Sequence, residues 1–217
     1  MKRSSLLVLM LYFLVAITDL VFIYLDQHSF RWFSKPLLIP LLVVAFYNEI
    51  PKPFPSIVYL VIFALFFSWC GDVFLQAEGF FIPGLVSFLL AHIFYIIYFR
   101  KQATEKRKWM VILPVLVYLS AFTVYLFPYL GDMKIPVVFY SLTIGTMLVM
   151  AFHVSDKQGK NYAAWFRYGA LFFVLSDSVL AFNLFVEKME ILSLVVMITY
   201  VLAQAMIVRG AMIQLSK

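Results

Sequence analysis

Long apolar segments separated by short polar stretches dominate this chain. Eight segments consist mostly of aliphatic and aromatic residues, and the charged residues gather between them. A helix needs about 20 apolar residues to cross the hydrocarbon core of a bilayer. We therefore predict an all-α integral membrane protein, a single domain over residues 1–217 built as a bundle of eight transmembrane helices. The expected helices cover residues 6–25, 35–47, 56–76, 80–99, 109–127, 133–152, 162–186 and 190–208.

The second of these segments is the shortest, and two prolines shape it. Pro36 follows Lys35 at the expected start, where a proline is tolerated because the first N–H of a helix has no partner. Pro40 lies in the interior, where its ring is expected to kink the helix. Residues 48–55 contain three prolines and predict a turn.

The composition favours a membrane protein over a soluble one. Hydrophobic residues make up 65% of the chain, charged residues 13%, and the mean hydropathy is +0.98, whereas an average soluble domain has about 25% charged residues. The net charge of +6 does not indicate nucleic-acid binding, because the basic residues lie in the turns. The one cysteine excludes an internal disulfide.

The positions of the basic residues predict the orientation in the membrane. Lys and Arg are enriched on the cytoplasmic side of membrane proteins. With a cytoplasmic N-terminus, most of the 17 basic residues fall inside, including those of a basic loop at 100–108. We expect both termini in the cytoplasm, in a multi-pass protein of the bacterial cytoplasmic membrane. The four basic residues left outside are Arg31, Lys35, Lys134 and Lys188.

Two aspartates interrupt the apolar segments. Asp72 lies in the third segment and Asp177 in the seventh. A charged aspartate at the centre of a spanning helix costs about 2.5–3.5 kcal/mol, so an intramembrane carboxylate indicates a functional site. Counted from the cytoplasmic ends of their helices, both lie in the outer half of the bilayer. Gly71, beside Asp72, is expected to let a neighbouring helix or a substrate approach closely.

The surroundings of the two aspartates suggest an internal repeat. When Asp72 is laid on Asp177, each aspartate is followed by a tyrosine at the same distance along the chain. This alignment favours a parallel repeat, in which the third and fourth helices match the seventh and eighth. The other aligned pairs are Phe67 with Phe172, Leu75 with Leu180, and Tyr95 with Tyr200.

Further polar side chains in or beside the apolar segments are candidates for positioning substrate or water. They are Asp19, Lys35, His92, Tyr95, Tyr200 and Gln204. A structural reading stays open for each: transmembrane polar groups commonly make interhelical hydrogen bonds, and a lysine can extend to the membrane surface. His92 is the one histidine well inside an apolar segment, so we expect no histidine-built metal site within the membrane.

A pair of buried carboxyl groups can divide acid and base chemistry between them. A carboxyl group removed from water, or placed beside another carboxylate, holds its proton to a higher pH than in solution. One member of a pair can then donate a proton while the other stays ionised. This division suits acid-catalysed cleavage of a lipid bond. The sequence contains no nucleophile elbow, phosphate-binding loop or zinc-protease helix.

Several motifs in one order resemble the lysoplasmalogenase family, the YhhN-like group of small polytopic membrane proteins. The motifs span about 170 residues, and the first helix carries little of the signature. They are Lys35-Pro36-Leu37, Gly71-Asp72-x-x-Leu75, Gly84-Leu85-x-x-Phe88-x-x-Ala91-His92-x-x-Tyr95, Tyr140, Met147, Gly169-Ala170-x-Phe172-x-x-x-Ser176-Asp177-x-x-Leu180-Ala181 and Thr199-Tyr200-x-x-Ala203-Gln204.

The resemblance implies hydrolysis of the vinyl ether bond of a lysophospholipid substrate, a lysoplasmalogen. The products are a fatty aldehyde and glycerophosphoethanolamine or glycerophosphocholine, and no cofactor is needed. Asp72 and Asp177 would be the catalytic acid and base, in an order that the sequence leaves open, and Lys35 would pair with the lipid phosphate. The remaining candidates would position water or the glycerol hydroxyl.

A proton-coupled transporter of a small or lipidic solute is the alternative. Membrane aspartates relay protons, and parallel repeats occur in transporters. Against this alternative, the two halves lack the matched Gly or Pro interruptions of broken-helix binding sites, since Pro40 and Pro114 are not equivalent positions. Apart from the family resemblance, the residues alone leave enzyme and transporter nearly balanced.

Overall fold

The computed structural model describes residues 1–103, 109–157 and 159–216, and these residues form an all-helical bundle. Among them, eight helices are long and apolar enough to cross a membrane, which confirms the predicted class. Two short 3₁₀ turns, η1 (Phe127–Tyr129) and η2 (Gly131–Met133), join the fifth helix to the sixth. The helices are α1 (Arg3–Tyr24), α2 (His28–Glu49), α3 (Val58–Gln76), α4 (Phe81–Gln102), α5 (Trp109–Leu126), α6 (Lys134–His153), α7 (Ala163–Phe185) and α8 (Glu190–Leu215).

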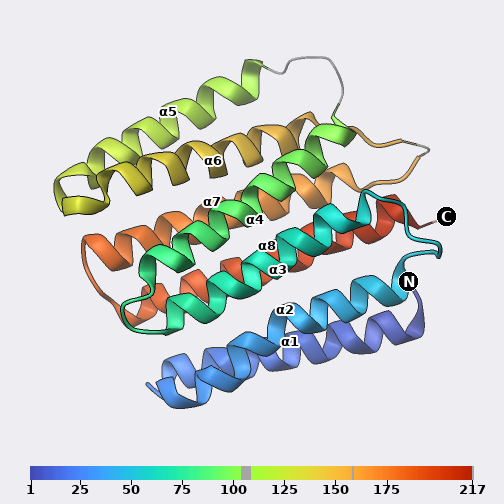
Figure 1. Ribbon diagram of the computed structural model, residues 1–217, viewed down its shortest axis with the longest axis horizontal. Coiled ribbons are helices and arrows are strands. Elements are labelled where there is room, and N and C mark those ends of the chain that lie inside the picture. The colour runs from blue at the N-terminus through green and yellow to red at the C-terminus, as the bar shows by residue number, and fades with distance from the viewer. Residues whose placement is uncertain (104–108, 158, 217) are drawn as a thin grey trace.

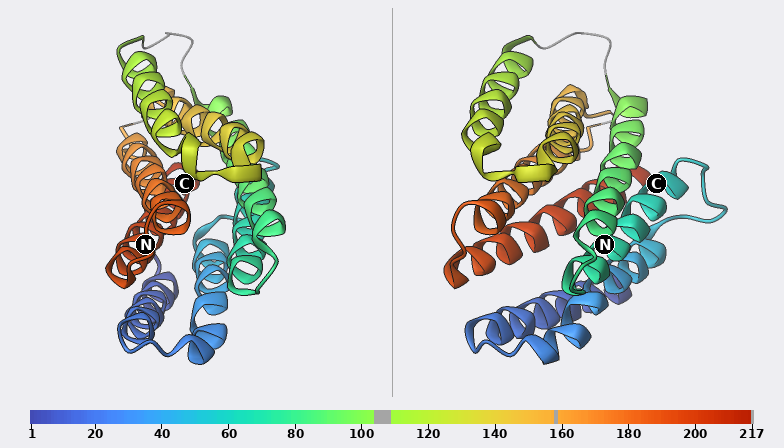
Figure 2. Two further views of the ribbon diagram at one scale, coloured as in Figure 1. Left: turned by 90° about the vertical axis from the view of Figure 1, so that its left-hand side faces the viewer. Right: turned by 60° about the vertical axis from the view of Figure 1, so that its left-hand side comes forward.

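The helices form hairpins arranged side by side. The α1–α2 hairpin lies at one side of the bundle and α5–α6 at the other, with α3, α4, α7 and α8 between them (Figures 1 and 2). Both chain ends lie at the same end of the bundle (Figure 1), as an even number of spans requires. The turns after α1, α3, α5 and α7 therefore share the opposite end.

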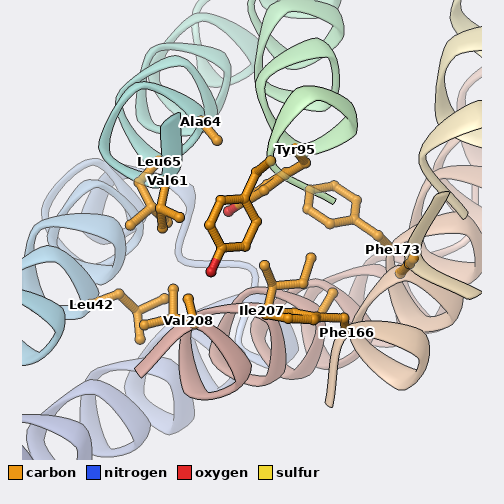
Figure 3. Close-up of a cluster of buried hydrophobic side chains, with 14 of the residues drawn as sticks. Leu42, Val61, Ala64, Leu65, Tyr95, Phe166, Phe173, Ile207 and Val208 are labelled. Carbon is orange, nitrogen blue, oxygen red and sulfur yellow. The ribbon is translucent and has the colours of Figure 1, made fainter. Parts of the chain in front are cut away.

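The core lies where α2, α3, α4, α7 and α8 meet. Leu42, Val61 and Phe166 are fully buried there, and Tyr95 projects from α4 into the middle of the cluster (Figure 3). The hydrocarbon of a bilayer is as apolar as these side chains, so close packing rather than burial from water holds such helices together.

Small residues allow the central helices to approach closely. A Cβ atom on Gly71 would lie 2.5 Å from Cδ2 of Phe88, so the α4 phenyl ring occupies the space that a side chain on α3 would fill. On the other hairpin, a Cβ atom on Gly169 of α7 would lie 3.0 Å from the Ala203 carbonyl oxygen of α8. The expected close approach of a helix at Gly71 is thus confirmed.

The predicted boundaries of α2 were wrong. The helix runs over 22 residues, His28–Glu49, and begins seven residues before the expected start at 35. Its first two turns mix polar with aromatic residues, and Arg31 and Lys35 there face a cavity inside the protein, so a search for continuous apolar residues misses them. Pro36 consequently lies inside the helix and not in its first turn.

The other boundaries differ mainly at the termini side of the bundle. Helix α8 continues to Leu215, seven residues past the expected end at 208, and α4 continues to Gln102. Residues 100–102 of the expected basic loop therefore belong to α4, while residues 104–108 lie outside the described residues. The added turns stay packed in the bundle: Ala211, Met212 and Gln102 are buried, and Gln214 of α8 accepts a hydrogen bond from the Tyr98 hydroxyl of α4.

Candidate active site

A cavity of about 660 Å³ opens between α2, α3, α7 and α8. His28, Glu78 and Lys188, at the helix ends opposite the two termini, line its mouth. Four of the predicted site residues line the same cavity farther along their helices. They are Lys35, Asp72, Asp177 and Tyr200.

Asp72 sits where three helices converge. Its side chain on α3 is 1% exposed, and Nζ of Lys35 on α2 lies 3.4 Å from its Oδ1. The hydroxyl of Tyr200 on α8 donates a hydrogen bond of 2.5 Å to its Oδ2. The negative charge of Asp72 thus has an ammonium group and a hydroxyl donor as direct partners.

Asp177 has a different set of partners, from α4 and α6. The hydroxyl of Tyr140 donates to its Oδ2 at 2.5 Å, and Nε2 of His92 lies 3.4 Å from the same oxygen. Nε2 of His92 is also 2.9 Å from the Tyr140 oxygen. Because the single hydroxyl proton of Tyr140 goes to Asp177, Nε2 must carry the imidazole proton for these contacts to be hydrogen bonds.

Tyr95 and Gln204 lie one layer behind the cavity wall. The Tyr95 hydroxyl donates to Oε1 of Gln204 at 2.9 Å, and Nε2 of Gln204 donates to the Tyr200 oxygen at 3.4 Å. Both side chains are fully buried and absent from the cavity lining. A chain of hydrogen bonds therefore leads from Tyr95 through Gln204 and Tyr200 to Asp72.

Asp19 also lies behind the wall, in contact with a residue that the sequence did not single out. Its carboxylate is fully buried; Oδ1 accepts from the Ser34 hydroxyl at 2.6 Å, and Oδ2 accepts from Nη2 of Arg31 at 3.2 Å. Arg31 itself lines the cavity. Asp19 thus fixes α1 to α2 and orients Arg31, while Asp72 and Asp177 line the cavity directly.

Sequence reasoning gave no role to Arg31, and it noted Tyr140 only as a motif residue. Arg31 was assigned to a turn because α2 was expected to begin at Lys35. Tyr140 is a polar side chain within an apolar segment, which is a usable signal, but spacing along one chain does not tell which aspartate it meets.

A second, apolar pocket lies on the other side of Asp177. It is a narrow slot of about 70 Å³ between α4, α5, α6 and α7. The slot and the polar cavity share four lining residues, so Asp177 stands at their junction. The shared residues are Leu75, Phe88, Asp177 and Leu180.

The described residues contain no group of three His, Cys, Asp or Glu side chains arranged to hold a metal ion. The charged groups that line the cavity are instead three carboxyl groups, two ammonium groups and one guanidinium, beside several hydroxyls and amides. Such a set can hold an amphipathic molecule and move protons on it.

A helical membrane bundle whose carboxylate-lined cavity joins an apolar slot defines a multi-pass membrane protein with a site suited to amphipathic ligands. The chain belongs to the YhhN family, whose sequence profile matches residues 30–211. This match confirms the family resemblance found in the sequence.

Curated relatives carry more specific names. The chain is 31% identical to human "Lysoplasmalogenase TMEM86B" over 192 residues, which cover 88% of this chain and 80% of the relative. It is 28% identical to the rat protein of that name, over 92% of this chain and 82% of the relative. Human "Lysoplasmalogenase TMEM86A" is 32% identical, over 68% of this chain and 62% of the relative. No solved structure matches the chain significantly.

Proposed function

We propose that this protein hydrolyses the vinyl ether bond of lysoplasmalogens in the membrane, with Asp72 and Asp177 as its acid–base pair. The observation that carries the proposal is that these aspartates, from two different hairpins, line one cavity that continues into an apolar slot. The names of the relatives support the same substrate class.

The layout of the two pockets fits a single-chain lipid. The polar cavity accepts glycerol and headgroup, and the apolar slot accepts the start of the hydrocarbon chain. A vinyl ether joins these two parts of a lysoplasmalogen, so the reacting bond falls at the junction, beside Asp177.

We assign the proton-donating role to Asp177. Its partners are the Tyr140 hydroxyl and the His92 imidazole, with no lysine or arginine among them, and its Oδ1 has no hydrogen bond to another described residue. A protonated Asp177 would donate to the β-carbon of the vinyl ether, which leaves an oxocarbenium ion at the α-carbon. Two carboxyl groups divide the work in a similar way when glycosidases pass through an oxocarbenium-like transition state.

Asp72 then stabilises the cation and guides water to it. The ammonium of Lys35 compensates a negative charge on Asp72, and the Tyr200 hydroxyl orients the carboxylate. Water adds to the α-carbon and gives up a proton to the Asp72 carboxylate, so that a neutral hemiacetal forms. This hemiacetal collapses to a fatty aldehyde and the glycerol hydroxyl, so one water molecule is consumed for each bond broken.

The remaining predicted site residues have positioning roles in this scheme. Gln204 and Tyr95 hold Tyr200 against Asp72, and His92 holds the Tyr140–Asp177 pair. Asp19 orients Arg31 at the wall of the cavity. With the termini cytoplasmic, as the basic residues predict, the cavity mouth faces the outer side of a bacterial cytoplasmic membrane.

Aldehyde release by the purified protein tests the proposal. In detergent with a vinyl ether lysolipid, the wild type should release aldehyde, and Asp72→Asn and Asp177→Asn should each lower the rate about 100-fold or more. Asp132→Asn, an exposed carboxylate at the α5–α6 turn, is the matched control and should keep the wild-type rate.

Two results would contradict the proposal. The absence of aldehyde release by the wild type would overturn the reaction, and full activity of both aspartate variants would overturn the mechanism. Uptake of an unchanged solute into proteoliposomes, driven by a pH gradient, would favour the transporter instead.

A further inference from the structure

Two charged residues at the mouth of the cavity have no partner among the residues that the structure describes. Glu78 lies in the turn between α3 and α4, and Lys188 in the turn between α7 and α8. Both are exposed, both line the cavity, and neither makes a hydrogen bond or ion pair with another described residue. They are therefore available to a ligand.

The other cations of the cavity are already compensated. Lys35 lies 3.4 Å from Asp72, and Arg31 lies 3.2 Å from Asp19. Lys35 is therefore less suited to the lipid phosphate than the sequence suggested, because its ammonium belongs to Asp72. Lys188 also lines the cavity, and it has no carboxylate partner among the described residues.

The two charges at the mouth that have no partner among the described residues are of opposite sign. Lys188 is a cation and Glu78 a carboxylate, and both line the cavity. A headgroup with one negative and one positive charge can match both, whereas a phosphate monoester would leave Glu78 unpaired beside a bound anion.

We propose that Glu78 and Lys188 form a subsite for a zwitterionic phospho-amine headgroup, Lys188 binding the phosphate and Glu78 the amine. This inference deepens the proposed function and rests on it for the identity of the lipid. A primary ammonium donates hydrogen bonds to the Glu78 carboxylate, whereas a trimethylated amine offers charge alone. Binding of a phosphoethanolamine lipid should therefore depend on Glu78 more than binding of a phosphocholine lipid does.

Binding of lipids that cannot be cleaved tests the subsite without turnover. The probes are saturated 1-O-alkyl lysolipids that carry phosphoethanolamine, phosphocholine or a bare phosphate, titrated into purified protein in detergent. Glu78→Gln should lower the affinity for the ethanolamine lipid about three- to fivefold and the affinity for the choline lipid less, as expected for an exposed charge pair. The same variant should bind the bare phosphate lipid as well as the wild type does, or better.

Lys188→Gln has a different expected signature. All three lipids carry a phosphate, so each should bind about three- to fivefold more weakly. Glu187→Gln and Lys134→Gln are the matched controls. Both residues are charged and lie at the same end of the bundle, but neither lines the cavity. With a cleavable vinyl ether substrate, the two subsite variants should raise KM and leave kcat unchanged.

The outcomes separate the subsite from the reaction. Equal weakening of all three lipids by Glu78→Gln, no weakening by either variant, or the same weakening in the controls would each overturn the subsite. If the wild type binds with the expected headgroup pattern but releases no aldehyde, the subsite stands and the proposed function falls. If aldehyde is released but the headgroup pattern is absent, the subsite alone falls.

Discussion

The two aspartates occupy matching places in the sequence but have different surroundings. Asp72 is almost completely buried and faces the ammonium of Lys35, whereas the Asp177 side chain is 15% exposed and has Tyr140 and His92 as partners. The repeat predicted from the sequence pairs Tyr95 with Tyr200. Of these two tyrosines only Tyr200 bonds to an aspartate, and that aspartate, Asp72, lies in the other hairpin. A repeated motif can thus supply two carboxyl groups, while the partners that distinguish them come from different helices.

The largest effect should follow from removing the ammonium beside Asp72. Lys35→Met leaves a carboxylate that is 1% exposed without its countercharge, and breaking a buried ion pair in this way costs about 3–5 kcal/mol. We expect a clear fall in the temperature of unfolding in detergent and loss of activity. Lys134→Met, which changes a lysine stacked on Phe127 at the protein surface, should have little effect.

The double variant Lys35→Met with Asp72→Asn sharpens this prediction. Removing both charges should recover much of the lost thermal stability, because no unpaired charge stays buried. Aldehyde release should stay low, since Asp72 is still missing. Recovery of both stability and activity would show that Asp72 has only a structural role.

Local signals explain which parts of the structure were predictable. The apolar segments and the two aspartates could be recognised in the sequence, because an apolar segment and a charge within it are both defined by residues adjacent in the chain. The start of α2 was not predictable, since Arg31 and Lys35 are polar residues that face a cavity formed by other helices. For the same reason, the sequence could not tell that Tyr140 and His92 meet Asp177, or that Asp19 lies behind Arg31.

A smaller effect on the rate is expected from removing the tyrosine hydroxyls that donate hydrogen bonds to the two aspartates. Tyr140→Phe removes the hydroxyl donor nearest to Asp177 and should lower the rate about tenfold, because hydrogen bonds to charged groups contribute about 1.5–3 kcal/mol. Tyr200→Phe should lower the rate of aldehyde release less, since the Lys35 ammonium still pairs with Asp72. Steady-state rates of aldehyde release compare the two variants.

Tyr162→Phe is the control for these two substitutions. Its hydroxyl donates to the backbone carbonyl oxygen of Ser155 at 3.0 Å, at the start of α7 and far along the helix from Asp177. A greater loss for Tyr200→Phe than for Tyr140→Phe would mean that Asp72, and not Asp177, depends more on its hydroxyl partner. That result would reverse the assignment of the proton donor.

The smallest effect on the reaction is expected from the layer behind Asp72. Gln204→Leu removes the acceptor of the Tyr95 hydroxyl and leaves that hydroxyl buried without a partner, which costs about 1–3 kcal/mol of stability. The rate should fall only about two- to threefold, because Tyr200 keeps its own bond to Asp72 and each unit of 1.4 kcal/mol in a barrier is about tenfold in rate.

Adding Tyr95→Phe to Gln204→Leu isolates the cause of that loss. The double variant has neither the donor nor the acceptor, so it should be more stable than Gln204→Leu alone. The rate should stay at the level of the single variant. If the rate of the double variant instead fell to that of Asp72→Asn, the Tyr95–Gln204 pair would be as necessary for the reaction as the carboxylate, and the difference between the cavity wall and the layer behind it would disappear.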